Sequence, residues 1–138
     1  MSTNAQWALQ KALLGVLNAD PATTAIFGNP LRVYDDVPEQ PVFPFATFDR
    51  ASVRPVNGDW PGALEHQMTL KVWSQYGGRR EALDGLHALR AAINAASVPL
   101  DGHQLVNVRT IFADVFRIRS SRVFEAILNL RAVTEILI

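Results

Sequence analysis

Residues 63–74 read ALEHQMTLKVWS, and this stretch decides the fold class of the chain. From Leu64 to Val72 every second residue is apolar except His66, and polar side chains occupy the positions between them. Successive side chains of a strand point to opposite faces, so this alternation is typical of a strand with one buried and one solvated face. The stretch therefore predicts a sheet that is covered on one side.

A second alternating stretch, residues 123–137, predicts another long strand of the same kind. Phe124, Ala126, Leu128, Leu130, Ala132 and Ile136 would line its buried face, with Thr134 as the one polar interruption. Aromatic and β-branched residues predict further strands at 31–34, 43–53 and 104–114. Proline, glycine and asparagine between 54 and 62 predict a long exposed loop there.

Three helices are expected. Apolar residues at three- and four-residue steps predict a helix over 3–19, and Asp20 followed by Pro21 predicts a second, short helix that ends at Gly28. The main amphipathic helix is expected over 79–96, with its inward residues being Ala82, Leu86, Leu89 and Ile93.

The resulting order, α-α-β-β-β-α-β-β, predicts an α+β fold. A mostly antiparallel sheet of four to five strands would be packed on one face by the two longer helices. The length of 138 residues suits one domain spanning residues 1–138, and no internal repeat is present.

The charge balance argues against a protein that works mainly by binding nucleic acid. Thirteen basic and thirteen acidic residues cancel, whereas phosphate contacts usually require a basic excess. Residues 1–69 carry four basic and seven acidic groups and residues 70–138 carry nine and six, so the halves stand at −3 and +3. This asymmetry would suit head-to-tail contacts between copies, and it is equally consistent with a solvated surface. No signal peptide or membrane-spanning segment is evident, which indicates a soluble protein used without export.

Asp35, Asp36 and Glu39 form the densest group of carboxylates. Clustered carboxylates can bind a divalent cation, but their spacing matches no calcium loop. Turn formation by the aspartate side chains is the favoured interpretation, and no metal is expected.

No catalytic constellation is visible in the sequence. His66 would lie on the apolar face of a strand, where a hydrogen-bonded core or interface histidine is expected, and His87 and His103 lack a recognisable serine or carboxylate partner. Gly77-Gly78-Arg79-Arg80 precedes a helix but lacks the pattern of a phosphate-binding loop, so a flexible turn with solvated arginines is favoured. We expect neither an enzyme nor a cofactor.

Three segments are the candidates for contact with partners: the loop 54–62, the turn 75–80 and an arginine-rich hairpin arm at 115–122. Arginine pairs with phosphate and carboxylate alike, so the arm could contact DNA or an acidic protein surface, or could be merely solvated. Exposed aromatic residues do not alternate with these arginines, which favours protein, and Trp7, Trp60 and Trp73 suit core or interface anchors. The candidate contact or lumen residues are Arg54, Asn57, Asp59, Trp60, Tyr76, Arg79, Arg80, Arg117, Arg119 and Arg122.

Several stretches, in this order, resemble the tail-completion family of long-tailed phages. They include LQKAL at 9–13, RVYDDVP at 32–38, FPF at 43–45, LKVWSQY at 70–76, GRREA at 78–82 and DGH at 101–103. The resemblance covers residues 8 to 135, and the chain is similar to the tail terminators of alphaproteobacterial gene transfer agents.

The resemblance implies a structural virion protein without catalytic residues. It would form a hexameric ring that caps the head-proximal end of the tail tube, stops polymerisation and joins the head-completion (stopper) protein, with DNA passing through the lumen. The expected partners are thus other copies of the chain, the tail-tube protein and the stopper, after assembly in the bacterial cytoplasm and without a membrane. A head-tail connector or stopper, a minor tail protein of the same particle and a small nucleic-acid-binding module are the alternatives.

Overall fold

A computed structural model describes residues 4–57, 60–119 and 121–137. The order α-α-β-β-β-α-β-β expected from the sequence is confirmed. The elements are α1 (Ala5–Ala19), α2 (Pro21–Phe27), β1 (Val33–Tyr34), β2 (Phe45–Asn57), β3 (Trp60–Ser74), α3 (Arg80–Asn94), β4 (His103–Arg117) and β5 (Phe124–Ile136).

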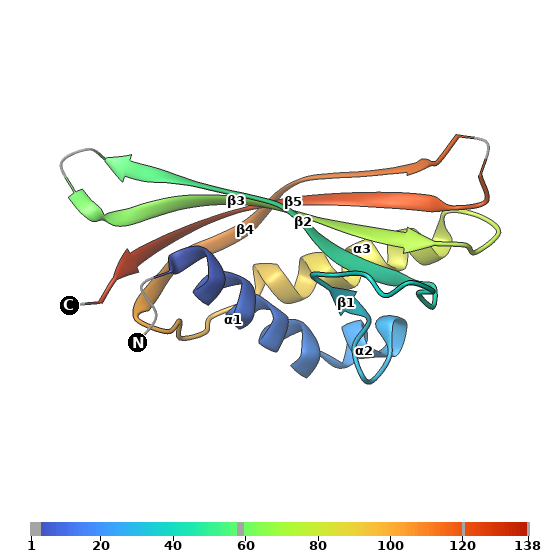
Figure 1. Ribbon diagram of the computed structural model, residues 1–138, viewed down its shortest axis with the longest axis horizontal. Helices are drawn as coiled ribbons and strands as arrows, with labels where there is room; N and C mark the ends of the chain where they lie inside the picture. Colours follow the sequence, from blue (N-terminus) through green and yellow to red (C-terminus); the bar gives the residue numbers. More distant parts are fainter. Residues whose placement is uncertain (1–3, 58–59, 120, 138) are drawn as a thin grey trace.

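The strands form a five-stranded sheet in the order β1-β2-β3-β5-β4. The short β1 pairs parallel to β2, and the remaining pairs are antiparallel. All three helices lie on one side of the sheet, so its other face is open (Figure 1). The α+β fold with one covered face is therefore confirmed.

The core lies between the helices and the covered face. Leu9, Leu13 and Leu17 of α1 are fully buried, as are Leu89 and Ile93 of α3. They pack in one cluster with the alternating apolar residues of β3 and β5, which are Met68, Leu70, Val72, Phe124, Ala126, Leu128, Leu130 and Ala132. The stripes expected from the sequence thus face one another as predicted, whereas Ile136 is half exposed at the end of β5.

His66 of β3 and Thr134 of β5 are two of the buried polar residues on this covered face. Both are buried, and the His66 Nε2 and Thr134 Oγ1 atoms share a hydrogen bond of 2.9 Å. The expectation of a hydrogen-bonded core histidine is confirmed. Burial, with a smaller contribution from the nearby His103, lowers the pKa of His66 to about 4.

Local signals fix the short helix α2 where the sequence predicted it. The Asp20 carboxylate accepts hydrogen bonds from the Thr23 backbone N at 3.1 Å and from Thr23 Oγ1 at 2.6 Å, while Pro21 occupies the first turn. Gly28 ends the helix with φ 86°, a conformation that favours glycine. Among the described residues, no helix is both long and apolar enough to cross a membrane.

The predicted loop 54–62 was wrong. β2 continues through Asn57 and β3 begins at Trp60, so most of this segment is a two-stranded ribbon at one end of the sheet (Figure 1). The neighbouring β1 covers β2 only at Ala46 and Thr47, which leaves the far half of β2 as an edge. Proline is tolerated on an edge strand because its missing N–H can face solvent, and this explains how Pro55 lies within β2.

The predicted arm 115–122 is a hairpin, but its strands are longer than expected. β4 continues to Arg117, which pairs with Phe124 at the start of β5. The prediction placed the boundary too early because charged and apolar residues mix in this segment, which weakened the alternation.

Neither Trp73 nor Trp7 belongs to the buried core cluster, so for these two residues the interface alternative stays a prediction. Trp73 stacks on Phe45 with ring centroids 6.2 Å apart, and its Nε1 donates to Thr47 Oγ1 at 3.3 Å. Trp7, in contrast, is half exposed on α1 and contributes little to the core.

Candidate functional site

The candidate contact residues fall at two opposite ends of the sheet. Arg54 lies in the β2–β3 ribbon at one end, together with the backbones of Asn57 and Trp60. The turn 75–80 and the described part of the arm 115–122 lie together at the other end, where β3 leads into α3 and β4 is followed by β5 (Figure 1). The fold therefore separates residues that the sequence grouped only by exposure.

Phe124 links the turn to the arm. The Arg79 guanidinium lies 5.4 Å from the centroid of the Phe124 ring, and Arg117 pairs with Phe124 across the β4–β5 ladder. An arginine over an aromatic face is weakly attracted to it, so Phe124 helps to hold Arg79 at this end. Tyr76 in the same turn is exposed, and Arg80 pairs with Asp84 one turn along α3 at 3.4 Å.

The arm itself is only partly fastened. Arg117 Nε donates to the backbone oxygen of Ser121 at 2.9 Å, which closes the turn. Arg119 and Arg122 are exposed, and neither side chain forms a hydrogen bond or ion pair within the described part of the chain. Two guanidinium groups are thus available at the tip of the hairpin.

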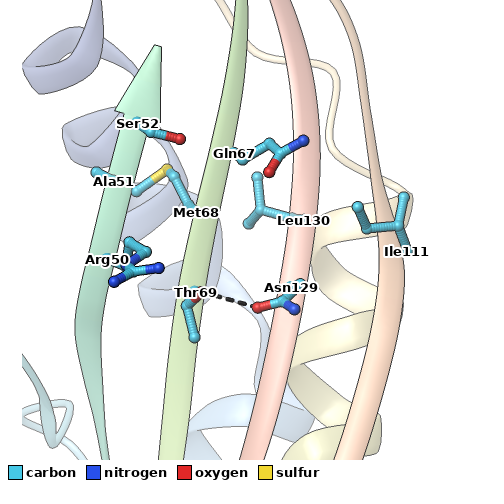
Figure 2. A pocket seen from close by; sticks show the side chains of 9 residues that line it. All are labelled: Arg50, Ala51, Ser52, Gln67, Met68, Thr69, Ile111, Asn129 and Leu130. Atoms are coloured by element: carbon cyan, nitrogen blue, oxygen red, sulfur yellow. Dashed lines mark hydrogen bonds between the residues drawn. The ribbon is translucent and has the colours of Figure 1, made fainter.

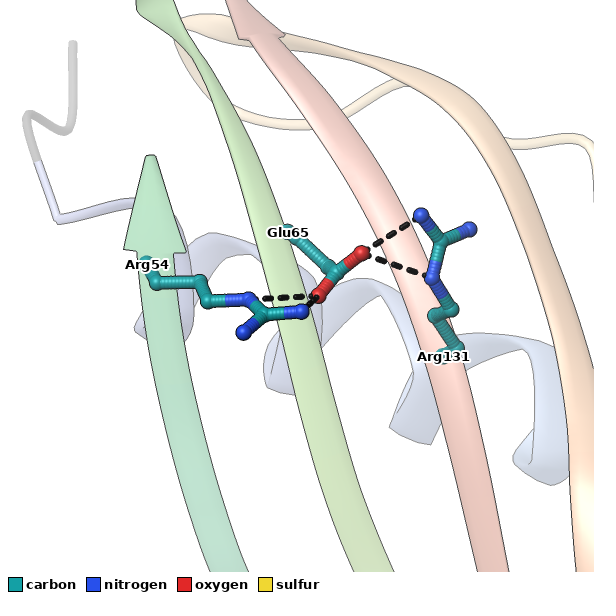
Figure 3. A network of polar contacts seen from close by, with 3 residues as sticks. All are labelled: Arg54, Glu65 and Arg131. Carbon is teal, nitrogen blue, oxygen red and sulfur yellow. Dashed lines mark hydrogen bonds and ion pairs between the residues drawn. The ribbon is translucent and has the colours of Figure 1, made fainter. Parts of the chain in front are cut away.

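At the opposite end, Arg54 belongs to a network on the open face that the sequence did not reveal (Figure 3). Glu65 of β3 lies between Arg54 of β2 and Arg131 of β5, accepting from Arg54 Nε at 2.7 Å and from Arg131 Nε at 2.8 Å. The hydrogen bond from Arg131 and then that from Arg54 lower the pKa of the Glu65 carboxyl. Only the register of β2, β3 and β5 brings these residues together, so no sequence pattern indicates the network.

Asn57, Asp59 and Trp60 cannot be assigned a contact role from their side chains. Asn57 and Trp60 pair through their backbones at the end of the ribbon. Their side chains, and the whole of Asp59, lie outside the described residues.

The open face also carries a hollow of about 440 Å³ between β2, β3, β5 and β4 (Figure 2). It lies between two β-bulges, at 49–50 on β2 and at Ile111 on β4, with the hydrogen-bonded Thr69 and Asn129 at its centre, 2.7 Å apart. Bulges increase the local twist, which accounts for the concave shape. Arg50 is the charged residue among those that line the hollow.

The isolated histidines and carboxylates form no metal-like arrangement in the described part of the chain. His103 is buried and its Nδ1 lies 3.0 Å from the Asp101 backbone oxygen, whereas His87 is exposed on α3. Asp35, Asp36 and Glu39 are exposed, and none of these side chains makes a hydrogen bond with a described residue. The turn-forming hydrogen bonds expected of the two aspartates are therefore missing.

Comparison with known proteins first defines the class. The fold closely matches a chain from a solved structure described as "Virion of native gene transfer agent (GTA) particle". The TM-score is 0.86 and the sequence identity 25%, and the match covers 97% of this chain and 99% of the other. The fold is thus that of a virion protein. No curated protein sequence matches significantly.

The family follows from the sequence itself. The model of the family "Tail completion protein gp17" matches residues 11–135, so the chain belongs to this family. It is a structural protein of the virion tail and not an enzyme, as the sequence predicted. The resemblance to the tail-completion family and to a gene transfer agent protein is confirmed.

Proposed function

We propose that the protein is a tail terminator and that its residues 1–138 act as one domain. It forms a ring, with six copies as the expected number, that caps the head-proximal end of the tail tube. The ring stops polymerisation of the tube and provides the surface on which the head-completion (stopper) protein docks, while DNA passes through the lumen.

One observation carries this proposal. The family match extends over residues 11–135, and the likeness to a gene transfer agent chain spans nearly the whole of both chains. The sheet also has exposed charged side chains at both of its ends, among them Arg54, Arg79 and Arg119, and such surfaces suit contact with other proteins. The partners are other copies of the chain, the tail-tube protein and the stopper.

Removing the gene tests the function directly. We expect DNA-filled heads without properly joined tails, together with free tubes of abnormal length, because nothing would end tube growth or present a docking face. Negative-stain electron microscopy of the lysate gives both readouts, and expression of the wild-type chain from a plasmid is the control. Tails of normal length joined to heads would contradict the assignment.

Affinity capture separates the terminator from its neighbours in the particle. A terminator should co-purify with the tail-tube protein. Co-purification with the portal-side adaptor in place of the tube would identify a connector or stopper.

A further inference from the structure

The two edges of the sheet carry opposite charge at the same end of the molecule. β1 forms one edge and β4 the other. A continuous row of paired residues runs across the sheet from Phe45 on β2 to Phe116 on β4. The loop 35–42 joins β1 to the start of β2, so it lies at one edge at the level where the β4–β5 arm leaves the other edge.

The first edge is acidic and partly apolar; we call residues 35–42 the acidic loop. Asp35, Asp36 and Glu39 are all exposed, and no side chain in the described part of the molecule neutralises them. Val37 and Val42 lie in the same loop with 40% and 62% of their surface exposed. The acidic loop thus presents three carboxylates together with two apolar side chains.

The second edge is basic and also partly apolar; we call residues 111–122 the basic edge. It carries three arginines, Arg117, Arg119 and Arg122, against a single carboxylate, Asp114. The exposed apolar residues on the same strand are Ile111, Phe112 and Phe116. The expectation that no exposed aromatic residues accompany these arginines was therefore wrong. A hollow of about 420 Å³ between α3 and β4, lined in part by Arg90 and Phe112, lies next to this edge.

We propose that the acidic loop of one copy docks against the basic edge of the next copy. Three carboxylates that pair with no described side chain meet three guanidinium groups on the other surface, and each surface adds exposed apolar side chains that the contact would bury. Arginine and aromatic residues are enriched in interfaces, and complementary charge fixes the partner and the register.

The position of the two edges is what selects a second copy as the partner. They lie at opposite edges of the same sheet, so one copy can use both at once. When two copies are in contact, the acidic loop of one and the basic edge of the other remain free to bind further copies. Such a heterologous contact generates a ring if the rotation closes. Binding of DNA would account for the basic edge alone and leaves the acidic loop without a role.

This inference rests on the proposed ring, and charge reversal tests it. The loop variant carries Asp35→Lys and Asp36→Lys, and the edge variant carries Arg119→Glu and Arg122→Glu. Arg117 is left unchanged because its bond to Ser121 closes the hairpin. The matched control exchanges the exposed pair Lys11 and Asp101, as Lys11→Glu with Asp101→Lys, away from both surfaces.

Each variant replaces the wild-type gene in cells that make the particle, and joined tails are counted by electron microscopy. Either variant alone should reduce joined tails at least about tenfold, because like charges would face each other at every contact. The four-substitution chain should recover most of the loss. Co-expression of the loop and edge variants should also recover it, because alternating copies place opposite charges at every contact of an even-numbered ring.

Three outcomes would overturn the inference: no assembly defect in either the loop variant or the edge variant, no recovery in the four-substitution chain, or no recovery when the two variants are co-expressed. Circular dichroism and melting temperatures establish that all variants fold. If duplex DNA binds the wild-type chain but not the edge variant, and no combination recovers assembly, the basic edge contacts DNA. If the wild-type chain itself is absent from the head-proximal end of tails, the proposed function has failed and not merely this contact.

Discussion

The two faces of the sheet show how differently the same strands can be used. On the covered face, alternate residues of β3 and β5 are apolar and buried, and His66 and Thr134 satisfy each other there. On the open face, most of the intervening residues are polar or charged, with the partly buried Trp73, Ile127 and Val133 as apolar exceptions. Arg54, Glu65 and Arg131 form a hydrogen-bonded network on this face. The covered face determines whether the chain folds, whereas the open face and the sheet edges are free to contact other proteins.

The largest expected effect comes from opening a cavity in the covered face. Leu128 is fully buried, so Leu128→Ala should lower the free energy of unfolding by about 2–5 kcal/mol. Its neighbour Ile127 points to the open face and is only half-buried, so Ile127→Ala should cost clearly less. Urea denaturation of both variants measures the difference. Equal losses in the free energy of unfolding would show that the covered face does not contribute more to stability than the open face.

A smaller, pH-dependent effect should come from His66. Its pKa in the folded state, about 4, lies below the ordinary value of 6.5, so the unfolded chain takes up a proton first as the pH falls. The contribution of neutral His66 to the free energy of unfolding is therefore fully present above pH 6.5, and it is lost progressively as the pH falls towards 4.

Replacing His66 by glutamine should flatten the fall in melting temperature between pH 7 and pH 5. The matched control is His87→Gln on the exposed face of α3, which should keep the wild-type slope. A wild-type slope in the His66→Gln chain would show that another group titrates in this window.

The smallest expected effect is on the open face. Arg131 contributes more than Arg54 to the lowered pKa of Glu65. Only 28% of the Arg131 side chain is exposed, against 73% for Arg54. Arg131→Met should therefore raise the Glu65 pKa further towards its usual value than Arg54→Met. NMR titration of the Glu65 carboxyl group measures this below pH 6, and a larger rise in Arg54→Met would reverse the ranking of the two arginines.

Local patterns predicted most of the fold because the buried core is formed by the same apolar residues that create those patterns. The alternation at 63–74, the helical stripe at 3–19 and the Asp20-Pro21 cap each depend only on residues within the element that they predict. The extension of β2 and β3 into the segment 54–62 was missed because prolines and glycines suggest a loop there. Pro55 becomes compatible with a strand because the short β1 leaves this part of β2 as an edge.

The candidate surfaces were harder to predict because they depend on register and strand order. Glu65 and Arg131 are 66 residues apart, and nothing in either segment indicates the other. Asp35 and Arg119 likewise acquire a joint meaning only when the order β1-β2-β3-β5-β4 places their segments at opposite edges. The sequence identified the arginines of the arm but not the surface that would complement them.

The most direct test of the proposed function is to locate this chain in an electron microscopy map of the intact particle. We expect a closed ring of copies between the last ring of tube subunits and the head-completion protein, with the acidic loop of each copy against the basic edge of its neighbour. Finding the chain at the distal end of the tail, or on the head side of the stopper, would contradict it.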